Sequence, residues 1–192
     1  TLKNQAEQIN NIILIHVNKT SIITDATSCI GGNTMLFCRD FSHVNSVEKD
    51  PVAVISLSKN LSMFKNKDIM NIDYVTVMNT LIQDVVFIDP PWGGKGYKRL
   101  CKLDLYLSGV DVYDIIENLY SVSNVVCLKC PVNYNFRESK KWNTHKYPIY
   151  KFSHVIFNVI IYKHDNRRTS QEGKEGIKIK MGQELLIKEG VG

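Results

Sequence analysis

A carboxylate, two prolines and a tryptophan directly follow one short apolar run. The run at 85–88 leads into Asp89-Pro90-Pro91-Trp92-Gly93-Gly94. Because proline fixes φ and has no backbone N–H, the carbonyl groups of this turn are held rigidly. Asp89 and the Pro90 carbonyl can accept both hydrogens of an exocyclic amine, and Trp92 can stack on the base. The segment predicts a catalytic site for methylation of a base amine, in preference to a proline-rich surface loop.

Three further carboxylates are expected at the ends of consecutive strands. Asp25, Glu48 and Asp73 each follow a short apolar run, and ligands of doubly wound sheets bind beyond the carboxyl ends of the strands. Glu48 lies about twenty residues after Asp25, the usual spacing for an acidic group that binds ribose hydroxyls. The three side chains therefore indicate a nucleoside-containing cofactor.

The turn from Asp25 to Thr34 contains Gly31-Gly32 but not the full G-x-G-x-x-G pattern of a dinucleotide site. Its glycines let the backbone approach a ligand closely. The Asp25 carboxylate repels a pyrophosphate but attracts the ammonium of a methionine moiety. We therefore expect S-adenosylmethionine, with S-adenosylhomocysteine as product, in preference to NAD; the alternative is that the glycines only ease a strand-to-helix turn.

The rest of the pattern indicates the elements that must position these residues. Apolar runs predict strands at 21–24, 43–47, 69–72, 85–88 and 125–128, then an antiparallel pair at 147–152 and 155–162. Helical periodicity predicts helices at 1–17, 33–41, 51–64 and 111–120, the third with Asp50 as N-cap and Pro51 at its first position. Strands that alternate with helices predict a doubly wound α/β fold with a mostly parallel sheet.

The 192 residues are enough for one α/β domain. We expect a methyltransferase domain at 1–163, in which the leading helix at 1–17 is the end of an N-terminal extension. A polar tail or appended element is expected at 164–192. The start at Thr1 rather than Met suggests that residues upstream have been removed.

Composition argues against several classes of protein. The sequence has no apolar run of eighteen residues and no secretory signal, so we expect no membrane association. Its odd number of cysteines, five, indicates free thiols in an intracellular, reducing compartment. Cys127-x-x-Cys130 lacks a second ligand pair and the histidines show no ligand spacing, so no metal is expected. Abundant asparagine, isoleucine and lysine suggest an AT-rich genome, such as that of a large DNA virus or a parasite.

Basic residues gather in two places, while the net charge of +5 is by itself weak evidence for an anionic partner. Lys95, Lys98, Arg99 and Lys102 follow the acceptor segment, and we expect them to contact RNA phosphates. For a second cluster, an RNA-binding face and a solvated face are equally good interpretations. Its members are Lys140, Lys141, Trp142, Lys146, Tyr147, Tyr150 and Lys151.

At these segments the sequence resembles the trimethylguanosine synthase family, the RNA cap guanine-N2 methyltransferases, over roughly residues 1–163. Residues 29–34 are similar to that family's G-V-G-G-N-T turn, and residues 47–51 to its I-D-I-D-P. Residues 84–94, with Tyr97, are similar to its D-V-V-F-x-x-P-P-W-G-G followed by a tyrosine. Asp73-Tyr74 stands where the family has Asp-Phe, and 124–133 resembles its next strand with a Pro-x-Asn end.

The resemblance implies the Rossmann-like, seven-stranded sheet of class I S-adenosylmethionine-dependent methyltransferases, with a C-terminal antiparallel hairpin. It implies that Glu48 binds the ribose, Asp73 the adenine amine and Trp92 a 7-methylguanine base. The expected cofactor-binding residues are Asp25, Ser28, Gly31, Gly32, Asn33, Thr34, Glu48, Asp73 and Asp89. The expected substrate-binding residues are Trp92, Tyr97, Lys95 and Asn133.

The sequence departs from the family at several positions. Cys29 replaces the first glycine, so the turn must accommodate a side chain. Asp89 stands where the family often has serine, which keeps an acceptor and adds charge. Val132 stands where it often has arginine, which removes one contact to the cap phosphates. The family also uses a helical segment before the core, so from a start at Thr1 we expect cofactor binding with slow or absent turnover.

The resulting hypothesis is methyl transfer to N2 of a 7-methylguanosine RNA cap. We expect a monomer that is nuclear in a cell or cytoplasmic for a virus. Two enzymatic alternatives remain: a methyltransferase for adenine N6, or one for guanine N2 within tRNA or rRNA. An alternative of another class is an inactive cap- or RNA-binding module of a capping assembly.

Overall fold

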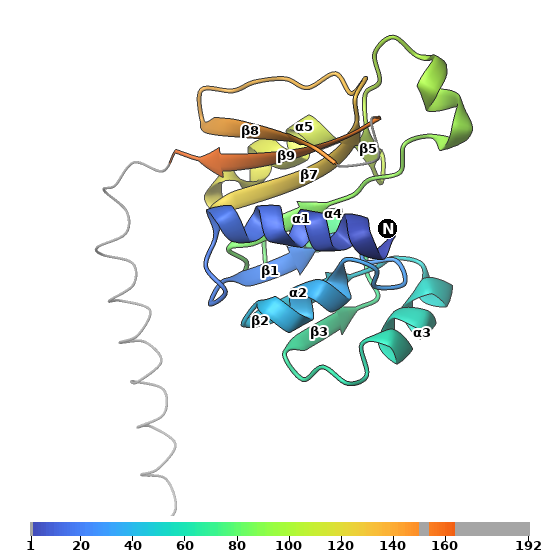
Figure 1. The fold of residues 1–192 in the computed structure, drawn as a ribbon, viewed down its shortest axis with the longest axis vertical. Coiled ribbons are helices and arrows are strands. Elements are labelled where there is room, and N and C mark those ends of the chain that lie inside the picture. The colour runs from blue at the N-terminus through green and yellow to red at the C-terminus, as the bar shows by residue number, and fades with distance from the viewer. Residues whose placement is uncertain (1, 150–153, 164–192) are drawn as a thin grey trace, which may run out of the picture. The chain divides into compact units, whose positions relative to one another are not determined.

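Seven strands form one sheet in the order β3-β2-β1-β4-β7-β9-β8 (Figure 1). The computed structural model describes residues 2–149 and 154–163, apart from the side chain of Lys95. The strands are β1 (Ile22–Asp25), β2 (His43–Val47), β3 (Lys67–Met70), β4 (Val85–Ile88), β7 (Val125–Pro131), β8 (Trp142–Pro148) and β9 (Val155–Tyr162). Five neighbouring strands, from β3 to β7, are parallel, and β9 pairs antiparallel with both β7 and β8. The expected seven-stranded, mostly parallel sheet with an antiparallel hairpin is confirmed.

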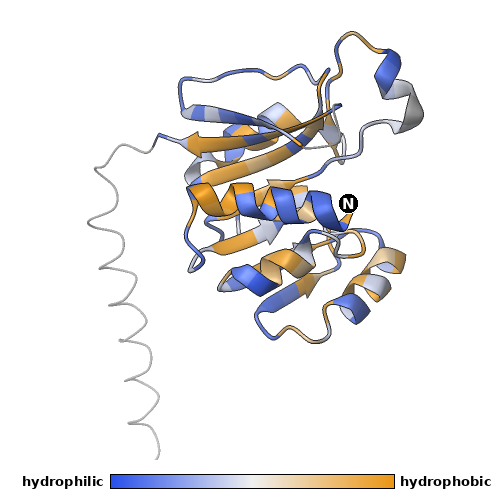
Figure 2. Ribbon diagram, in the orientation of Figure 1, coloured by the Kyte–Doolittle hydropathy of each residue, from blue (hydrophilic) through white to orange (hydrophobic). Residues whose placement is uncertain are grey.

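Helices cover both faces of this sheet. The helices α1 (Lys3–His16), α2 (Thr34–Asp40) and α3 (Pro51–Asn60) bury apolar side chains in one core cluster, together with Phe87 of β4. The helices α4 (Tyr74–Val77) and α5 (Val112–Asn118) contribute to a second cluster, together with Val86 of β4. Because successive strand residues point to opposite faces, β4 is buried on both. The strands β7 and β9 are likewise strongly apolar (Figure 2).

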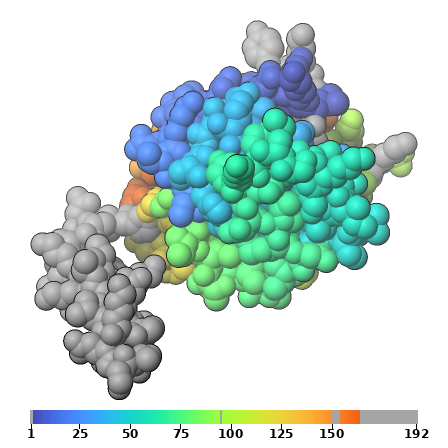
Figure 3. Space-filling view, turned by 90° about the horizontal axis from the view of Figure 1, so that it is seen from below, coloured from blue at the N-terminus to red at the C-terminus, as the bar shows by residue number. Residues whose placement is uncertain are grey.

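Aspartates set the starts of three helices. The side chain of Asp50 accepts a hydrogen bond from Val52 N at 3.0 Å at the start of α3, and Pro51 takes the first helical position, as predicted. Asp73 caps α4 and Asp111 caps α5 in the same way. Along the chain α3 follows α2 after one strand, both helices contribute to the first core cluster, and their surface is seen in light blue to teal in Figure 3.

Two predicted strands were misplaced. The third begins at Lys67 rather than 69 and ends at Met70 rather than 72, because polar edge residues pair with β2 before the apolar run starts. Of the strand expected at 147–152, residues 150–152 lie outside the described part of the chain, and the strand described there is β8, Trp142–Pro148, which pairs with β9 along its length. As an edge strand β8 carries polar side chains such as Asn143 and Lys146, so its sequence lacks an apolar signal.

The region between β4 and α5 contains elements that the periodicity did not predict. A 3-10 helix, η1 (Gly94–Arg99), follows the acceptor segment, and a short hairpin joins β5 (Tyr106–Leu107) to β6 (Val110–Asp111). The hairpin turns at Ser108 and Gly109, whose φ angles are 53° and 84°. Two consecutive left-handed residues are typical of the tight turn that suits a twisted two-strand ribbon.

Most predicted helices keep their place but are shorter. The leading helix is Lys3–His16, α2 is Thr34–Asp40, and α3 ends at Asn60 rather than 64. A second 3-10 helix, η2 (Leu119–Ser121), continues α5 towards β7. The tail expected at 164–192 lies outside the described residues.

Candidate active site

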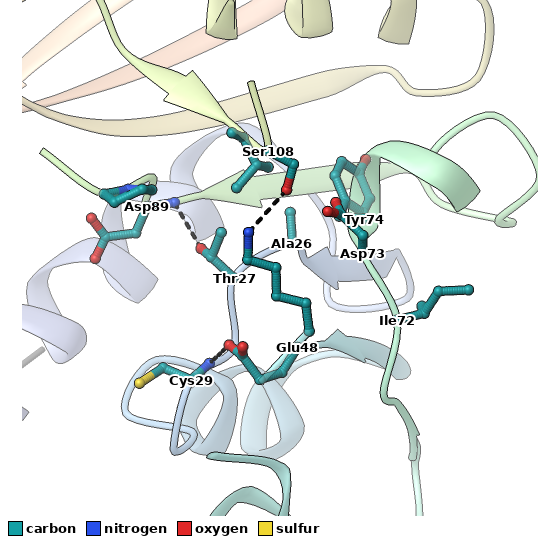
Figure 4. Close-up of a pocket in the computed structure, with 12 residues that line it drawn as sticks. Ala26, Thr27, Cys29, Glu48, Ile72, Asp73, Tyr74, Asp89 and Ser108 are labelled. Carbon is teal, nitrogen blue, oxygen red and sulfur yellow. Dashed lines mark hydrogen bonds between the residues drawn. The ribbon is translucent and has the colours of Figure 1, made fainter. Parts of the chain in front are cut away.

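A cavity of about 270 Å³ opens at the carboxyl ends of β1, β2 and β4 (Figure 4). This is the edge at which ligands of doubly wound sheets bind. Three of the predicted carboxylates, those of Glu48, Asp73 and Asp89, lie around it (Figure 4). The remaining lining residues are Ala26, Thr27, Cys29, Lys49, Ile72, Tyr74, Pro91, Leu107 and Ser108.

Asp25 lies beneath this cavity at the end of β1 and is only 1% exposed. Its carboxylate accepts hydrogen bonds from Thr34 Oγ1 at 2.7 Å and from Thr27 N at 3.3 Å. Burial raises the pKa of Asp25 to about 7; the two hydrogen bonds oppose the shift, and the charges of Asp89 and Glu48 add to it. A cationic ligand group near Asp25 would stabilise the ionised carboxylate.

The turn after β1 adopts left-handed backbone at two positions. Gly31 has φ of 94°, and a Cβ placed there would lie 3.1 Å from Leu57 Cδ1. Cys29, which replaces a family glycine, takes φ of 48° and points its thiol to the surface. The Ser28 hydroxyl donates to the Asp25 carbonyl at 3.1 Å. The turn thus tolerates the cysteine side chain but not a side chain at Gly31.

Glu48 ties this turn to β2. One of its carboxylate oxygens accepts from Cys29 N and the other from Asp50 N, both at 2.8 Å. A carboxylate has about four acceptor positions, so these bonds fix its orientation and leave capacity for two hydroxyl donors. Asp73, on the next strand end, accepts from Val75 N at 3.1 Å. Ile72 and Tyr74 beside it give the cavity an apolar wall.

The β5–β6 hairpin closes one side of the cavity. Leu107 is buried and lines the cavity with Ser108, whose hydroxyl accepts from Lys49 Nζ at 3.2 Å. None of these three residues was predicted for the site. The Ser108-Gly109 pair, which suits a tight turn, was the available sequence signal.

Asp89 follows β4 and joins the acceptor segment to the first loop. Its amide donates to Thr27 Oγ1 at 3.0 Å, and its Oδ2 lies 2.6 Å from Nζ of Lys129. Lys129 lies on β7 and was not predicted. Because Ile88 pairs with Leu128 in the parallel β4–β7 register, the next residues of the two strands lie side by side. Equal apolar runs at 85–88 and 125–128 carry that signal in the sequence.

Trp92 packs against both core clusters and is only partly exposed. Its ring meets Tyr97 edge-on at a centroid distance of 5.3 Å, and Lys129 Nζ lies 5.6 Å from its centroid. Its Nε1 is buried and has no hydrogen-bond partner among the described residues. Within that part of the chain the cavity wall includes Asp89 and Pro91 but not Trp92. The indole therefore lies behind the acceptor turn instead of facing the cavity.

Asn133 holds the loop after Trp92. Its side-chain amide donates to the carbonyls of Tyr97 and Leu100, both at 2.8 Å, so it supports η1. The exposed basic side chains of Lys98, Arg99 and Lys102 lie on or next to this loop. The side chain of Lys95 lies outside the described part.

The remaining predicted cofactor residues lie in the first loop. In the described part of the chain they do not line the cavity. Gly32 is partly buried, Asn33 is buried just before α2, and Thr34 binds Asp25 from the first turn of that helix. Of these three, Thr34 is the residue that holds the Asp25 carboxylate. A ligand that reaches this carboxylate would meet them next.

Two lysines of the second basic cluster form ion pairs at the surface of the fold. Lys141 pairs with Glu117, and Lys146 pairs with Glu138 and lies over the Phe136 ring. Trp142 is 2% exposed and packs against Tyr113 and Tyr162. The Trp142 ring belongs to the core, so it does not present a face to a partner from this cluster. Tyr150 and Lys151 lie outside the described residues.

Cys127 and Cys130 lie in β7, which is buried throughout, and burial raises the pKa of both thiols. Among the described residues no group of three or more His, Cys, Asp or Glu side chains could hold a metal ion. No helix in the same part of the chain is long and apolar enough to cross a membrane.

The family model described as RNA cap guanine-N2 methyltransferase matches residues 20–168. Uncharacterized protein L320 of Acanthamoeba polyphaga mimivirus is 31% identical over 149 residues, which cover 72% of this chain and 58% of that protein. The chain therefore spans less than two thirds of this viral relative.

Solved structures share the fold at low sequence identity. An rRNA methylase from Streptococcus thermophilus is 12% identical with a TM-score of 0.57, over 86% of this chain and 99% of that one. A candidate methyltransferase from Streptococcus mutans, in complex with SAH, is 12% identical with a TM-score of 0.61, over 85% of this chain and 100% of that one. These structures show the class I methyltransferase architecture of the chain.

Proposed function

The chain belongs to the RNA cap guanine-N2 methyltransferase family, and from this premise we propose that it transfers a methyl group from S-adenosylmethionine to N2 of a 7-methylguanosine RNA cap. One observation carries the proposal beyond family membership. Asp89 and Pro91 of the acceptor segment line the same cavity as Glu48 and Asp73, the residues expected to bind the cofactor. An amine held by Asp89 would thus lie next to the methyl donor.

The side chains around the cavity fit the cofactor. The buried Asp25 carboxylate suits the ammonium of the methionine part, and Glu48 has acceptor capacity for ribose hydroxyls. Asp73 would accept from the adenine amine, with Ile72 and Leu107 as apolar contacts to the ring. When bound, S-adenosylmethionine supplies an electrophilic methyl group on a sulfonium. Family membership and the relative in complex with SAH support this cofactor.

The chain's own residues would act by alignment. Asp89 and the Pro90 carbonyl accept the two amine hydrogens, which directs the nitrogen lone pair towards the methyl carbon. A nitrogen–carbon bond forms as the carbon–sulfur bond breaks, and the electron pair of that bond stays on sulfur. The amine then loses a proton to Asp89 or to water. Exclusion of water from the cavity assists the reaction.

Base recognition requires a change at Trp92. In the structure its indole packs behind the acceptor turn with Nε1 buried and without a partner among the described residues. A buried N–H without an acceptor is unfavourable, so rotation of the ring towards a bound base would relieve that penalty. A cationic 7-methylguanine would gain stacking and cation–π attraction on the exposed indole. The basic residues Lys98, Arg99 and Lys102 would contact the phosphates.

The decisive experiment incubates the chain with S-adenosylmethionine and four acceptors and measures product mass. The acceptors are 7-methylguanosine-capped RNA, the same RNA with an unmethylated guanosine cap, an uncapped tRNA–rRNA mixture and adenine-containing oligonucleotides. Methyl gain on the 7-methylguanosine cap alone supports the proposal. Methyl gain on internal guanine or on adenine alone would assign one of the two other base-amine activities instead.

A binding titration separates an enzyme from a binding module. An enzyme for the cap binds both S-adenosylmethionine and 7-methylguanosine diphosphate. Binding of the cap analogue without the cofactor would overturn the proposal and indicate an RNA-binding module. An Asp89→Ala variant is the matched control in both assays, because it removes the acceptor carboxylate and leaves Asp25, Glu48 and Asp73 in place.

A further inference from the structure

Lys129 is a lysine in an unusually buried position. Every residue of β7 is buried, and the Lys129 side chain is 9% exposed. A lysine is rarely buried unless its charge is paired, because removal of an ammonium from water is unfavourable. The β4–β7 register supplies the partner by placing Asp89 beside Lys129. The position of this lysine is therefore tied to the acceptor segment.

The ammonium of Lys129 contacts both ends of that segment. Nζ lies 2.6 Å from Oδ2 of Asp89 and 5.6 Å from the ring centroid of Trp92. Asp89 and Trp92 flank the two prolines, which already restrict the backbone between them. The ion pair restrains the rotation of the Asp89 carboxylate, whereas the contact with Trp92 belongs to the packed position of the indole before a base binds. One side chain thereby links the group expected to hold the amine with the ring expected to stack on the base.

The same ammonium offsets a concentration of negative charge. The negative charges of Asp89 and Glu48 both raise the pKa of the buried Asp25 carboxyl, so all three carboxylates lie close enough for their charges to matter at Asp25. Lys129 is the cation in direct contact with Asp89. Without it, repulsion between the two carboxylates would favour rotation of the Asp89 side chain away from Asp25 and the cavity. The ion pair keeps the carboxylate at the cavity wall, where Asp89 is found.

We propose that Lys129 is a positioning residue for methyl transfer, which sets the orientation of Asp89 without itself touching the reacting atoms. This inference rests on the proposed function, because it assigns Asp89 the role of amine acceptor. It predicts that loss of Lys129 slows turnover at saturating cofactor and leaves cofactor affinity nearly intact. A purely structural lysine would change both constants through unfolding.

The test compares Lys129→Met, Lys129→Arg and the control Lys19→Met in steady-state methylation of capped RNA. Lys19 forms an exposed ion pair with Asp40, so its variant removes the same charge and the same contact type away from the cavity. We expect kcat of Lys129→Met to fall about 10- to 100-fold, since small misplacements have effects of this size. The KM for S-adenosylmethionine should stay within about threefold. Lys129→Arg should recover at least about a third of kcat, because arginine pairs with carboxylates and stacks on aromatic rings.

A second variant guards against misfolding of Lys129→Met. The double variant Asp89→Asn/Lys129→Met removes both charges, so no buried carboxylate loses its partner. We expect it to unfold at nearly the wild-type temperature and to remain as slow as Lys129→Met. If the wild type is active and the folded Lys129→Met variant has a kcat within about twofold of the wild-type value, the positioning role alone is overturned. A wild type that methylates internal guanine or adenine but not the cap would overturn the proposed function instead, because the acceptor then differs.

Discussion

The hydroxyl of Thr27 accepts a hydrogen bond from the amide of Asp89 at 3.0 Å, although the two residues lie 62 positions apart in the chain. The amide of Thr27 donates to Asp25 Oδ1 at 3.3 Å. One residue of the first loop therefore contacts both the carboxylate proposed for the methionine ammonium and the segment proposed for the base amine. The relative position of donor and acceptor depends on this link.

Thr27→Val should separate the two halves of the site. The variant keeps the amide bond to Asp25 and loses the hydroxyl bond to Asp89, whose net contribution is about 0.5–1.5 kcal/mol. We expect kcat to fall about two- to tenfold, with S-adenosylmethionine affinity within about twofold by calorimetry. Thr80→Val is the control, since Thr80 is exposed and bonds only the nearby Val77 carbonyl among the contacts described. A larger loss of cofactor affinity than of kcat would contradict the linking role.

Cofactor binding should depend on pH through Asp25. Its pKa of about 7 means that the carboxylate becomes protonated as pH falls through neutrality, and a neutral carboxyl attracts an ammonium less. We expect affinity for S-adenosylmethionine to weaken from about pH 8 to about pH 6 in calorimetric titrations. Asp25→Asn should bind weakly at every pH in this range and lose the dependence. If the affinity for S-adenosylmethionine depends on pH equally in the wild type and in Asp25→Asn, Asp25 is not the group responsible.

The stability of the unliganded chain should fall as pH rises, whereas the affinity for the cofactor should increase. The folded chain holds a proton on Asp25 up to about pH 7, whereas the reference pKa is 3.8. The folded state is therefore favoured by protonation, and this contribution is lost as pH rises through the folded pKa. We expect the free energy of unfolding in urea to fall between about pH 5 and about pH 7.5, and Asp25→Asn to flatten the curve.

Trp92→Ala should weaken cap binding and leave cofactor binding nearly unchanged. Loss of base stacking amounts to about 1–3 kcal/mol, or about five- to 150-fold in affinity. Because the ring also packs on both core clusters, Trp92→Phe serves as a control that retains an aromatic side chain. Fluorescence or calorimetric titration with 7-methylguanosine diphosphate provides the measurement. Unchanged cap affinity in a folded Trp92→Ala protein would count against the proposed role.

Gly31→Ala tests the turn of the first loop. The left-handed φ and the 3.1 Å approach to Leu57 Cδ1 both oppose a methyl group, so we expect a loss of about 1–3 kcal/mol in unfolding free energy. Gly109→Ala is the matched control, because Gly109 has φ of 84° but no atom within 4 Å of an added Cβ. The difference between the two variants isolates the contact with Leu57. Equal losses would mean that backbone strain alone requires the glycine.

Much of the fold could be predicted because buried parallel strands have a clear sequence pattern. Both β2 and β4 have the predicted bounds, and every residue of β4 is apolar and buried. The expected carboxylates, Glu48, Asp73 and Asp89, do meet at one cavity, because strand ends of a parallel sheet share an edge. These features depend on local pattern and on one general rule of topology.

The features of the fold and of the site that could not be predicted from the sequence depend on tertiary contacts. Lys129 was identified as part of the site from the register of β4 and β7, because the sequence shows that the two apolar runs have equal length but not that they are neighbours in the sheet. The hairpin around Ser108 has two-residue strands, too short for a periodic pattern. Trp92 was expected to face a ligand, but apolar packing holds it behind the turn in the absence of a base.

The bonds from Asn133 to the carbonyls of Tyr97 and Leu100 affect the entropy of recognition. The Asn133 carbonyl also accepts from Leu103 N at 2.9 Å, so the end of β7 fastens the loop after the acceptor segment at three places. A loop that is already ordered gives up little conformational freedom when RNA binds, and more of the contact energy then appears as affinity. Asn133 would contribute to binding by preparing the loop, without contacting the RNA.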